Sequence, residues 1–502
     1  MNIAQAKKNI RDSVKLYLKK DADGNYLMPV VRQRPIFLKG APGIGKTAIM
    51  EQIAQELGIA LVSYSMTHHT RQSAIGLPLI EKKNYGGGEC AVSEYTMSEI
   101  IAAVYDTMEE SGLKEGILFL DEINCVSETL YPSMLQFLQY KVFGRHRVPE
   151  GWVVVTAGNP PEYNRMVREF DVVTMDRLRL MEVEADVRAF LDYAAERRIH
   201  AAILSYLELR KEHFYVMELV AGGREYVTAR GWEDLSAMLR LYEDEGLEAD
   251  ESLFSQYLHH ETVVKEFAAY YLLYRKYEQE YRIAEILKGG DHSALIQRVS
   301  EASFDERVLL SGMLTDRLET DMHAVLVNKD VLQLVRPVIS KAAQLDDGEA
   351  LSAVGAEAER LKERMKRLSA AAALSDAEKE ATRGAVRFLS DTENRLRSGE
   401  NGNSPYAEYI KERYREKLET LKEEAAQAGH GLSSLLSFAE AAYTEESDLL
   451  LLLTRITVSD TISRFIALFG NEEYNRLSGK LMVRDRKAEF RDEIRSFLES
   501  GE

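Results

Sequence analysis

Short apolar runs alternate with amphipathic stretches through the first 183 residues of the chain. The run Gly116–Leu120 is apolar at every position, which is typical of a strand buried on both faces of a parallel sheet. The stretches between such runs carry apolar residues at helical spacing, beginning with residues 1–20. This alternation predicts an α/β fold with a doubly wound parallel sheet. The predicted strands are residues 35–38, 59–64, 116–120, 152–156 and 178–183, and the predicted helices between them are 47–57, 98–108 and 130–140.

The pattern changes at about residue 185, where the strand signal disappears and helical spacing takes over. Residues 185–275 are predicted to be helical, with a polar break at 221–224. We therefore divide the chain into three predicted parts. They are an α/β domain with an N-terminal helix over 1–184, a helical segment over 185–245 and an all-α region over 246–502.

The all-α region contains a run rich in Ala, Glu, Lys and Arg near residues 348–397. Ser375 and Glu378 have the spacing of a capping box, so the run is predicted to be two helices that form an antiparallel hairpin. Glycine, asparagine and serine near residues 398–405 predict a loop. Further helices are predicted at about 406–428, 432–446 and 449–469.

A glycine-rich segment joins the first predicted strand to the helix that follows it. It fits the pattern G-x-x-x-x-G-K-[ST], whose glycines let several backbone N–H groups point at one phosphate. Lys46 can reach the β- and γ-phosphates, and the Thr47 hydroxyl can hold Mg²⁺. The sequence therefore predicts a nucleoside triphosphate site. The residues of this loop are Gly40, Ala41, Pro42, Gly43, Ile44, Gly45, Lys46 and Thr47.

Polar side chains follow two other predicted strands at the point where each strand ends. Asp121 and Glu122 come directly after the apolar strand, and Asn159 follows the next one. Open α/β sheets bind ligands at the carboxyl ends of their strands, so these residues are expected beside the phosphates. The alternative reading of the acidic pair is a cap for the next helix.

Two other segments carry possible chemistry. The sequence His68-His69-Thr70-Arg71 suggests a metal site, but it lacks an i, i+4 partner or a cysteine pair, so a polar loop is favoured. Residues 80–95 around Gly86–Gly88 predict a β-hairpin with a glycine tip.

Composition narrows the class of protein. The formal net charge of −18 argues against a dedicated nucleic-acid binder, because such proteins usually present a basic face. Two cysteines are too few for a disulfide framework and fit a reducing compartment. The most apolar window, 449–453, is followed by Arg455 and Asp460, so no membrane insertion is expected. A cytoplasmic protein is the simplest interpretation.

Five segments in this order resemble the AAA+ ATPases, and within them the MoxR-like group. The resemblance covers about residues 30–245 and does not extend into the C-terminal half. The segments are GAPGIGKT (40–47), ILFLDEIN (117–124), VVVTAGNPP (153–161), MDRL (175–178) and TARGW (228–232).

The resemblance implies a role for each matched residue. Lys46 and Thr47 match the Walker A lysine and threonine. Asp121 matches the Walker B aspartate that orders Mg²⁺, and Glu122 matches the glutamate that polarises the attacking water. Asn159 matches sensor 1, which helps to position that water.

Two arginines complete the resemblance. Arg177 is similar to the arginine finger that is offered to a neighbouring subunit, although Leu178 stands where a phenylalanine is common. Arg145 and Arg147 are rival candidates for the finger. Arg230 is similar to the sensor 2 arginine of a small helical lid, which would be residues 185–245.

The resemblance implies an ATPase that uses ATP and Mg²⁺ and assembles as a ring, a homo-hexamer that remodels a partner protein. MoxR-like proteins often act with a partner that carries a von Willebrand factor A-type domain. The competing functions are an AAA+ nucleic-acid motor or loader and a scaffold that binds nucleotide without hydrolysing it. Residues 246–502 are either a partner-binding arm or a stabilising appendage.

Overall fold

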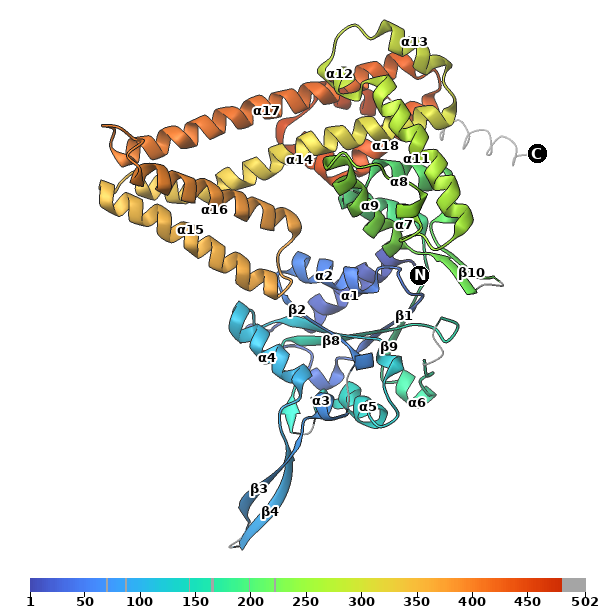
Figure 1. The fold of residues 1–502 in the computed structure, drawn as a ribbon. Helices are drawn as coiled ribbons and strands as arrows, with labels where there is room; N and C mark the ends of the chain where they lie inside the picture. The colour runs from blue at the N-terminus through green and yellow to red at the C-terminus, as the bar shows by residue number, and fades with distance from the viewer. Residues whose placement is uncertain are drawn as a thin grey trace, which may run out of the picture. The chain divides into compact units, whose positions relative to one another are not determined.

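The chain divides into two compact units, which we describe separately (Figure 1). The first unit consists of Met1–Ala189 and Ala356–Val386. The second unit consists of Phe190–Gly355 and the residues from Arg387 onward. The computed structural model describes residues 1–68, 71–85, 88–143, 145–163, 167–197, 199–220 and 223–480.

The first unit is built on a five-stranded sheet in the order β2-β5-β8-β1-β9. Every neighbouring pair of strands is parallel, which confirms the α/β fold class and the parallel sheet expected from the apolar runs. The strands are β1 (Ile36–Gly40), β2 (Ala60–Ser65), β5 (Gly116–Asp121), β8 (Trp152–Gly158) and β9 (Arg179–Val183).

Helices cover both faces of this sheet (Figure 1). α1 (Ile3–Tyr17) and α2 (Lys46–Leu57) lie on one face, and α4 (Glu99–Ser111) and α5 (Tyr131–Tyr140) lie on the other. Alternate strand residues, which point to opposite faces, are buried on both sides. The core between the sheet and these two helices includes Phe37, Val62, Leu118, Leu120 and Val154 of the strands, Ile101 and Val104 of α4, and Met134 and Phe137 of α5.

A two-stranded hairpin extends away from the sheet (Figure 1). Its strands are β3 (Pro78–Tyr85) and β4 (Gly88–Tyr95), paired antiparallel as the sequence predicted. Gly86 and Gly87 lie outside the described residues. The first unit also contains the short elements α3 (Arg71–Ile75), α6 (Val172–Met175), β6 (Val142–Phe143) and β7 (His146–Arg147).

The tip between α15 (Asp347–Ala370) and α16 (Asp376–Arg397) belongs to the first unit. The backbone N–H of Leu61 in β2 donates to the carbonyl of Ala371 at 3.0 Å, and the Ala371 side chain is buried in the core beside α4. β2 is an edge strand of the sheet, so this tip covers part of its outer edge. Ser375 and Glu378 make both hydrogen bonds of the capping box that starts α16.

The second unit is mainly helical. A buried ion pair of 2.6 Å between Arg307 Nε and Asp448 Oδ2 joins the start of α14 to α18. No helix among the described residues is apolar enough, over enough length, to cross a membrane. The helices of the second unit are α7 (Val187–Glu196, which begins in the first unit), α8 (Ala201–Leu209), α9 (Ala229–Asp244), α10 (Glu251–Phe254), α11 (Glu261–Tyr281), α12 (Ile283–Lys288), α13 (Ser293–Glu301), α14 (Phe304–Ala342), α17 (Tyr406–Ala442), α18 (Glu446–Val458) and α19 (Asp460–Phe469).

The prediction that strands end at residue 185 is wrong at one place. β10 (Val216–Val220) and β11 (Gly223–Val227) pair antiparallel where a helical stretch with a polar break was expected. The two segments are short and rich in valine, and Gly223 has a φ of +142° at the start of β11. Their strand signal was hidden because long helical patterns flank them on both sides.

The predicted break between residues 428 and 432 is also wrong, because α17 runs unbroken through Gly429 and Gly431. A glycine inside a helix costs roughly 1 kcal/mol relative to alanine. The same stretch buries Leu432, Leu435 and Leu436, and burial of a leucine side chain contributes about 1.5–3 kcal/mol. Packing therefore outweighs the local preference of the two glycines.

One buried lysine gives the first unit a pH-dependent stability. Lys141, at the end of α5, is only 2% exposed, and its ammonium donates to the Val30 carbonyl at 3.0 Å and lies 3.5 Å from Gln33 Oε1. No carboxylate of the described residues pairs with this ammonium, so desolvation lowers the pKa of Lys141 from 10.5 to about 8. Between pH 8 and pH 10.5, Lys141 is protonated in more of the unfolded chains than of the folded chains. The free energy of unfolding should therefore rise with pH over this range.

We therefore expect the free energy of unfolding of the wild type to gain about 2–3 kcal/mol between pH 8 and pH 10 relative to Lys141→Met. The chain has two tryptophans, Trp152 in the first unit and Trp232 in the second. Urea unfolding followed by Trp152 fluorescence in a Trp232→Phe background reports the first unit alone. Parallel pH curves for wild type and variant would contradict this assignment.

Candidate active site

The glycine-rich loop connects β1 to α2, with Gly40 ending the strand and Lys46 starting the helix. Gly43 and Gly45 have φ values of +73° and +93°, a region that other residues adopt only with strain. A Cβ on Gly40 would lie 2.6 Å from the carbonyl oxygen of Val183 in β9, so a side chain has no room there. The loop is thus curled against the sheet at the start of a helix, where backbone N–H groups attract anions.

The ammonium group of Lys46 lies inside this loop. It donates to the carbonyl oxygens of Gly40 and Ala41 at 2.8 and 2.7 Å, and to Oδ1 of Asn159 at 2.9 Å. The structure therefore brings together the lysine that matches Walker A and the asparagine that matches sensor 1. Asn159 follows β8, the neighbour of β1 in the sheet.

Thr47 connects the loop to the acidic residues at the end of β5. Its hydroxyl donates to Oδ2 of Asp121 at 3.2 Å, and the other oxygen of Asp121 accepts the backbone N–H of Glu122 at 2.8 Å. We call Lys46, Thr47, Asp121, Glu122 and Asn159 the P-loop cluster. Its members come from the ends of three strands, as the rule for carboxyl ends of parallel strands predicted.

The carboxylate of Glu122 is bound by residues at the end of β2 and just after it. Its Oε2 accepts hydrogen bonds from the hydroxyls of Ser65 and Thr67, both at 2.9 Å. Ser65 ends β2, which lies on the opposite side of β5 from β8 and β1, the strands that precede Asn159 and Lys46. The backbone of Glu122 has a φ of +55°, a conformation that costs a non-glycine residue about 1–3 kcal/mol. The two hydroxyls therefore hold the carboxylate on the β2 side.

If the P-loop cluster hydrolyses ATP, as the resemblance to AAA+ ATPases implies, Ser65→Ala combined with Thr67→Val should raise kcat for ATP hydrolysis by roughly threefold to tenfold. Hydrogen bonds to a charged group contribute about 1.5–3 kcal/mol, and part of this energy must be given up before Glu122 can turn toward Lys46. Steady-state ATPase assays on the purified chain measure the effect. The same pair of substitutions in a Glu122→Gln background is the control and should leave the residual rate unchanged. A lower kcat for the double variant would mean that the hydroxyls hold Glu122 in its working position.

Sequence reasoning missed Ser65, Thr67 and Asn124 as members of the site. The Asn124 amide donates to the backbone carbonyl of Asn159 at 2.8 Å, and a Cβ on Gly158 would overlap Oδ1 of Asn124. The strand-end rule would have found Ser65, because β2 was predicted to end at this edge. No sequence signal distinguishes Thr67.

Cys125 lies beside the acidic pair and is buried. Burial raises the pKa of its thiol, and the charges of Glu122 and Asp121 raise it further. The thiol therefore stays protonated and adds no charge to the site.

The two arginines assigned by resemblance belong to different units. Arg177 follows α6 and is half-buried, and no hydrogen bond or ion pair between described residues joins it to the cluster. The pKa of Asp171 is lowered by its hydrogen bonds to Thr174 and by the nearby charge of Arg177. Arg230 belongs to the second unit, where it is exposed in the first turn of α9.

The rival arginines differ from Arg177 in their surroundings. Arg145 forms an ion pair with Glu94 of β4, so its guanidinium is held by the hairpin. Arg147 is an exposed residue of β7.

The donors of the P-loop cluster fit Mg²⁺. A hydroxyl oxygen and a carboxylate oxygen lie 3.2 Å apart in Thr47 and Asp121, and such hard oxygen donors are what this ion prefers. The structure shows no group of three or more His, Cys, Asp or Glu residues arranged for a metal within the part of the chain that it describes. Of the histidine segment, His69 and Thr70 lie outside the described residues.

Comparison with known families agrees with the geometry. Residues 36–178 match the model of the ATPase family associated with various cellular activities (AAA). The match begins with β1 and ends just before β9, so it contains the whole P-loop cluster but less than half of the chain. No curated protein sequence matches the chain. The family match supports an AAA+ ATPase core in the first unit.

Proposed function

We propose that the chain hydrolyses ATP to ADP and phosphate at the P-loop cluster. The observation that carries this proposal is the set of hydrogen bonds that links Lys46 to Asn159 and Thr47 to Asp121 at one edge of the sheet. Phosphoryl transfer needs positioned groups and charge neutralisation more than covalent chemistry. These residues supply both requirements from a rigid scaffold.

Each residue has a separate task in this proposal. Lys46 and the N–H groups at the start of α2 bind the phosphates of ATP. Thr47 and Asp121 would hold Mg²⁺, which when bound neutralises phosphate charge. Glu122 leaves the hydroxyls of Ser65 and Thr67 and orients the attacking water. Asn159 fixes the Lys46 ammonium and, as sensor 1, helps to hold the same water.

The finer assignment is a MoxR-like ATPase that acts in the cytoplasm as a ring, a homo-hexamer. In this assignment Arg177 acts on the ATP of a neighbouring subunit and Arg230 senses nucleotide from the helical lid. The ring remodels a partner protein that carries a von Willebrand factor A-type domain. The order of motifs from residue 40 to residue 232 supports this assignment by resemblance.

Affinity purification of the Glu122→Gln chain from its own cells with excess ATP tests this assignment. Loss of hydrolysis should keep the ATP-bound assembly intact, so we expect a ring of identical chains together with a protein that carries a von Willebrand factor A-type domain. Lys46→Ala, which should not retain ATP, is the matched control and should recover neither.

The competing function predicts a different outcome of the same purification. A nucleic-acid motor or loader would retain DNA or RNA, and its ATPase rate would rise on adding nucleic acid and fall steeply with salt. A monomeric Glu122→Gln chain in saturating ATP would contradict the ring. The net charge of −18 disfavours the nucleic-acid alternative.

A further inference from the structure

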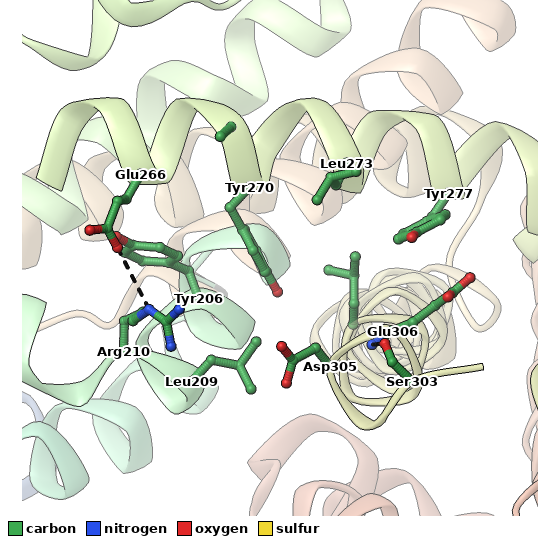
Figure 2. Close-up of a pocket in the computed structure, with 12 residues that line it drawn as sticks. Tyr206, Leu209, Arg210, Glu266, Tyr270, Leu273, Tyr277, Ser303, Asp305 and Glu306 are labelled. Carbon is green, nitrogen blue, oxygen red and sulfur yellow. Dashed lines mark hydrogen bonds and ion pairs between the residues drawn. The ribbon is translucent and has the colours of Figure 1, made fainter. Parts of the chain in front are cut away.

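The second unit contains a cavity of about 530 Å³ that the ATPase chemistry does not use (Figure 2). It lies between the end of α8, the middle of α11 and the first turns of α14. Its volume is within the range of pockets that bind small ligands, which is roughly 300–1,000 Å³.

The charged residues of the cavity favour a cationic ligand. Arg210 is the one basic residue among those that line it, and its Nε lies 3.6 Å from Oε2 of Glu266. Asp305 and Glu306 then leave an excess of two negative charges. An anion would meet these carboxylates, while the one guanidinium is already neutralised.

The positive end of the α14 dipole offsets this negative charge only in part, and the first turn of α14 supplies no basic side chain that could neutralise it. Its N-cap is Ser303, whose hydroxyl accepts the backbone N–H of Glu306 at 3.3 Å. Arg307, on the same turn, is held by Asp448 of α18. Glu306 accepts the hydroxyl of Tyr281 at 2.5 Å, whereas Asp305 is exposed and forms no hydrogen bond or ion pair with any described residue.

A buried hydroxyl provides an independent indication of a ligand. The Tyr270 oxygen is buried without a hydrogen-bond partner among the described residues, and its ring points from α11 into the cavity above Asp305 (Figure 2). Ser205 lies close enough to lower the pKa of Tyr270, but the two hydroxyls do not complete a hydrogen bond. Burial and the charge of Asp305 raise that pKa, so the phenol keeps its proton and its oxygen can accept an N–H donor.

The rest of the lining suits an aliphatic stem. Leu209, Leu273 and Leu309 contribute apolar surface, and the rings of Tyr270 and Tyr277 can face a cation. Long basic groups bury their methylenes against such surface and keep the charged end among polar groups.

We propose that this cavity binds an alkyl cation, a guanidinium or ammonium group on an aliphatic stem, whose N–H donors are shared between the Asp305 carboxylate and the Tyr270 hydroxyl. The cation comes either from a free small molecule or from an arginine or lysine side chain of a bound protein segment. The proposal rests on the second unit alone and is independent of ATP hydrolysis.

Titration of the full chain with three probes that each contain a four-carbon chain tests the charge requirement. Calorimetry should detect binding of butylguanidinium at millimolar concentration, and at least tenfold weaker binding of butanol and of butyrate. Asp305→Asn should weaken butylguanidinium binding at least tenfold, because a hydrogen bond to a charged group is lost. Asp321→Asn, on the same helix and paired with Arg317 outside the cavity, is the matched control and should bind as the wild type does.

Tyr270→Phe keeps the test decisive if Asp305→Asn impairs folding. This variant removes a hydroxyl without a partner, so the chain should stay folded while butylguanidinium binding weakens severalfold. Equal binding of butylguanidinium and butanol, or unchanged binding in both variants, would overturn the proposal.

A blocked tripeptide, Gly-Arg-Gly, separates the two sources of the cation. Binding of the peptide at least as tight as that of butylguanidinium indicates a side chain of a protein segment. Binding of butylguanidinium with exclusion of the peptide indicates a free small molecule. If neither probe binds, the cavity is not a site for alkyl cations.

Discussion

Glu122→Gln is expected to lower kcat for ATP hydrolysis by about 10² or more while leaving the affinity for ATP within a factor of three. The amide keeps the size of the side chain but cannot accept a proton or align water as a carboxylate does. Lys46, Thr47 and Asp121 are unchanged in this variant and still hold the nucleotide. Steady-state turnover and equilibrium binding of a fluorescent ATP analogue give the two quantities separately.

Glu128→Gln is the control for this experiment. Glu128 is an acidic residue of the loop after β5, highly exposed and paired with Arg168. The same change there should leave kcat within a factor of two. Turnover that persists in Glu122→Gln would show that another group orients the water and that the roles in the P-loop cluster are assigned wrongly.

Arg177→Ala is expected to lower kcat by about 10³, with ATP binding intact, if the arginine serves the site of a neighbouring subunit. Mixing this variant with Glu122→Gln tests the geometry of the contact. A Glu122→Gln subunit still offers Arg177, and an Arg177→Ala subunit still offers Glu122. Mixed assemblies therefore contain complete sites, so the mixture should hydrolyse ATP at a rate well above that of either variant alone.

Arg145→Ala is the matched control, because Arg145 is the rival candidate for the same role. An Arg145→Ala chain mixed with Glu122→Gln should show no recovery beyond the rate of its own unmixed assembly. Recovery with Arg145→Ala and none with Arg177→Ala would exchange the two assignments. No recovery in either mixture would mean that neither arginine acts across subunits.

The parallel sheet could be predicted because its strands are apolar from end to end. Gly116–Leu120 illustrates this, since only a strand covered on both faces can bury every side chain. The P-loop cluster was predictable for a related reason. Residues that follow neighbouring parallel strands must meet where the carboxyl ends of those strands lie side by side. Lys46 and Asn159 are 113 positions apart in the chain and 2.9 Å apart in the structure.

The remaining features depend on tertiary contacts that no local pattern reports. Glu122 accepts hydrogen bonds from Ser65 and Thr67. These bonds depend on the direction in which the positive φ of Glu122 turns its side chain. α17 continues through two glycines because its leucine side chains are buried within the second unit. β10 and β11 are short enough for their alternation to be lost between longer helical runs.

The contact between Leu61 and Ala371 has a consequence for the synthesis of the chain. The two residues are separated by roughly 300 positions, which a ribosome adds in on the order of 15–60 seconds at 5–20 residues per second. The outer edge of β2 emerges early, and the backbone N–H of Leu61 has no Ala371 carbonyl to pair with during that time. Exposed strand edges are templates for pairing with other chains. Nascent chains on the same mRNA can therefore pair with one another through the exposed edge of β2. This exposure ends only after the tip between α15 and α16 has been synthesised.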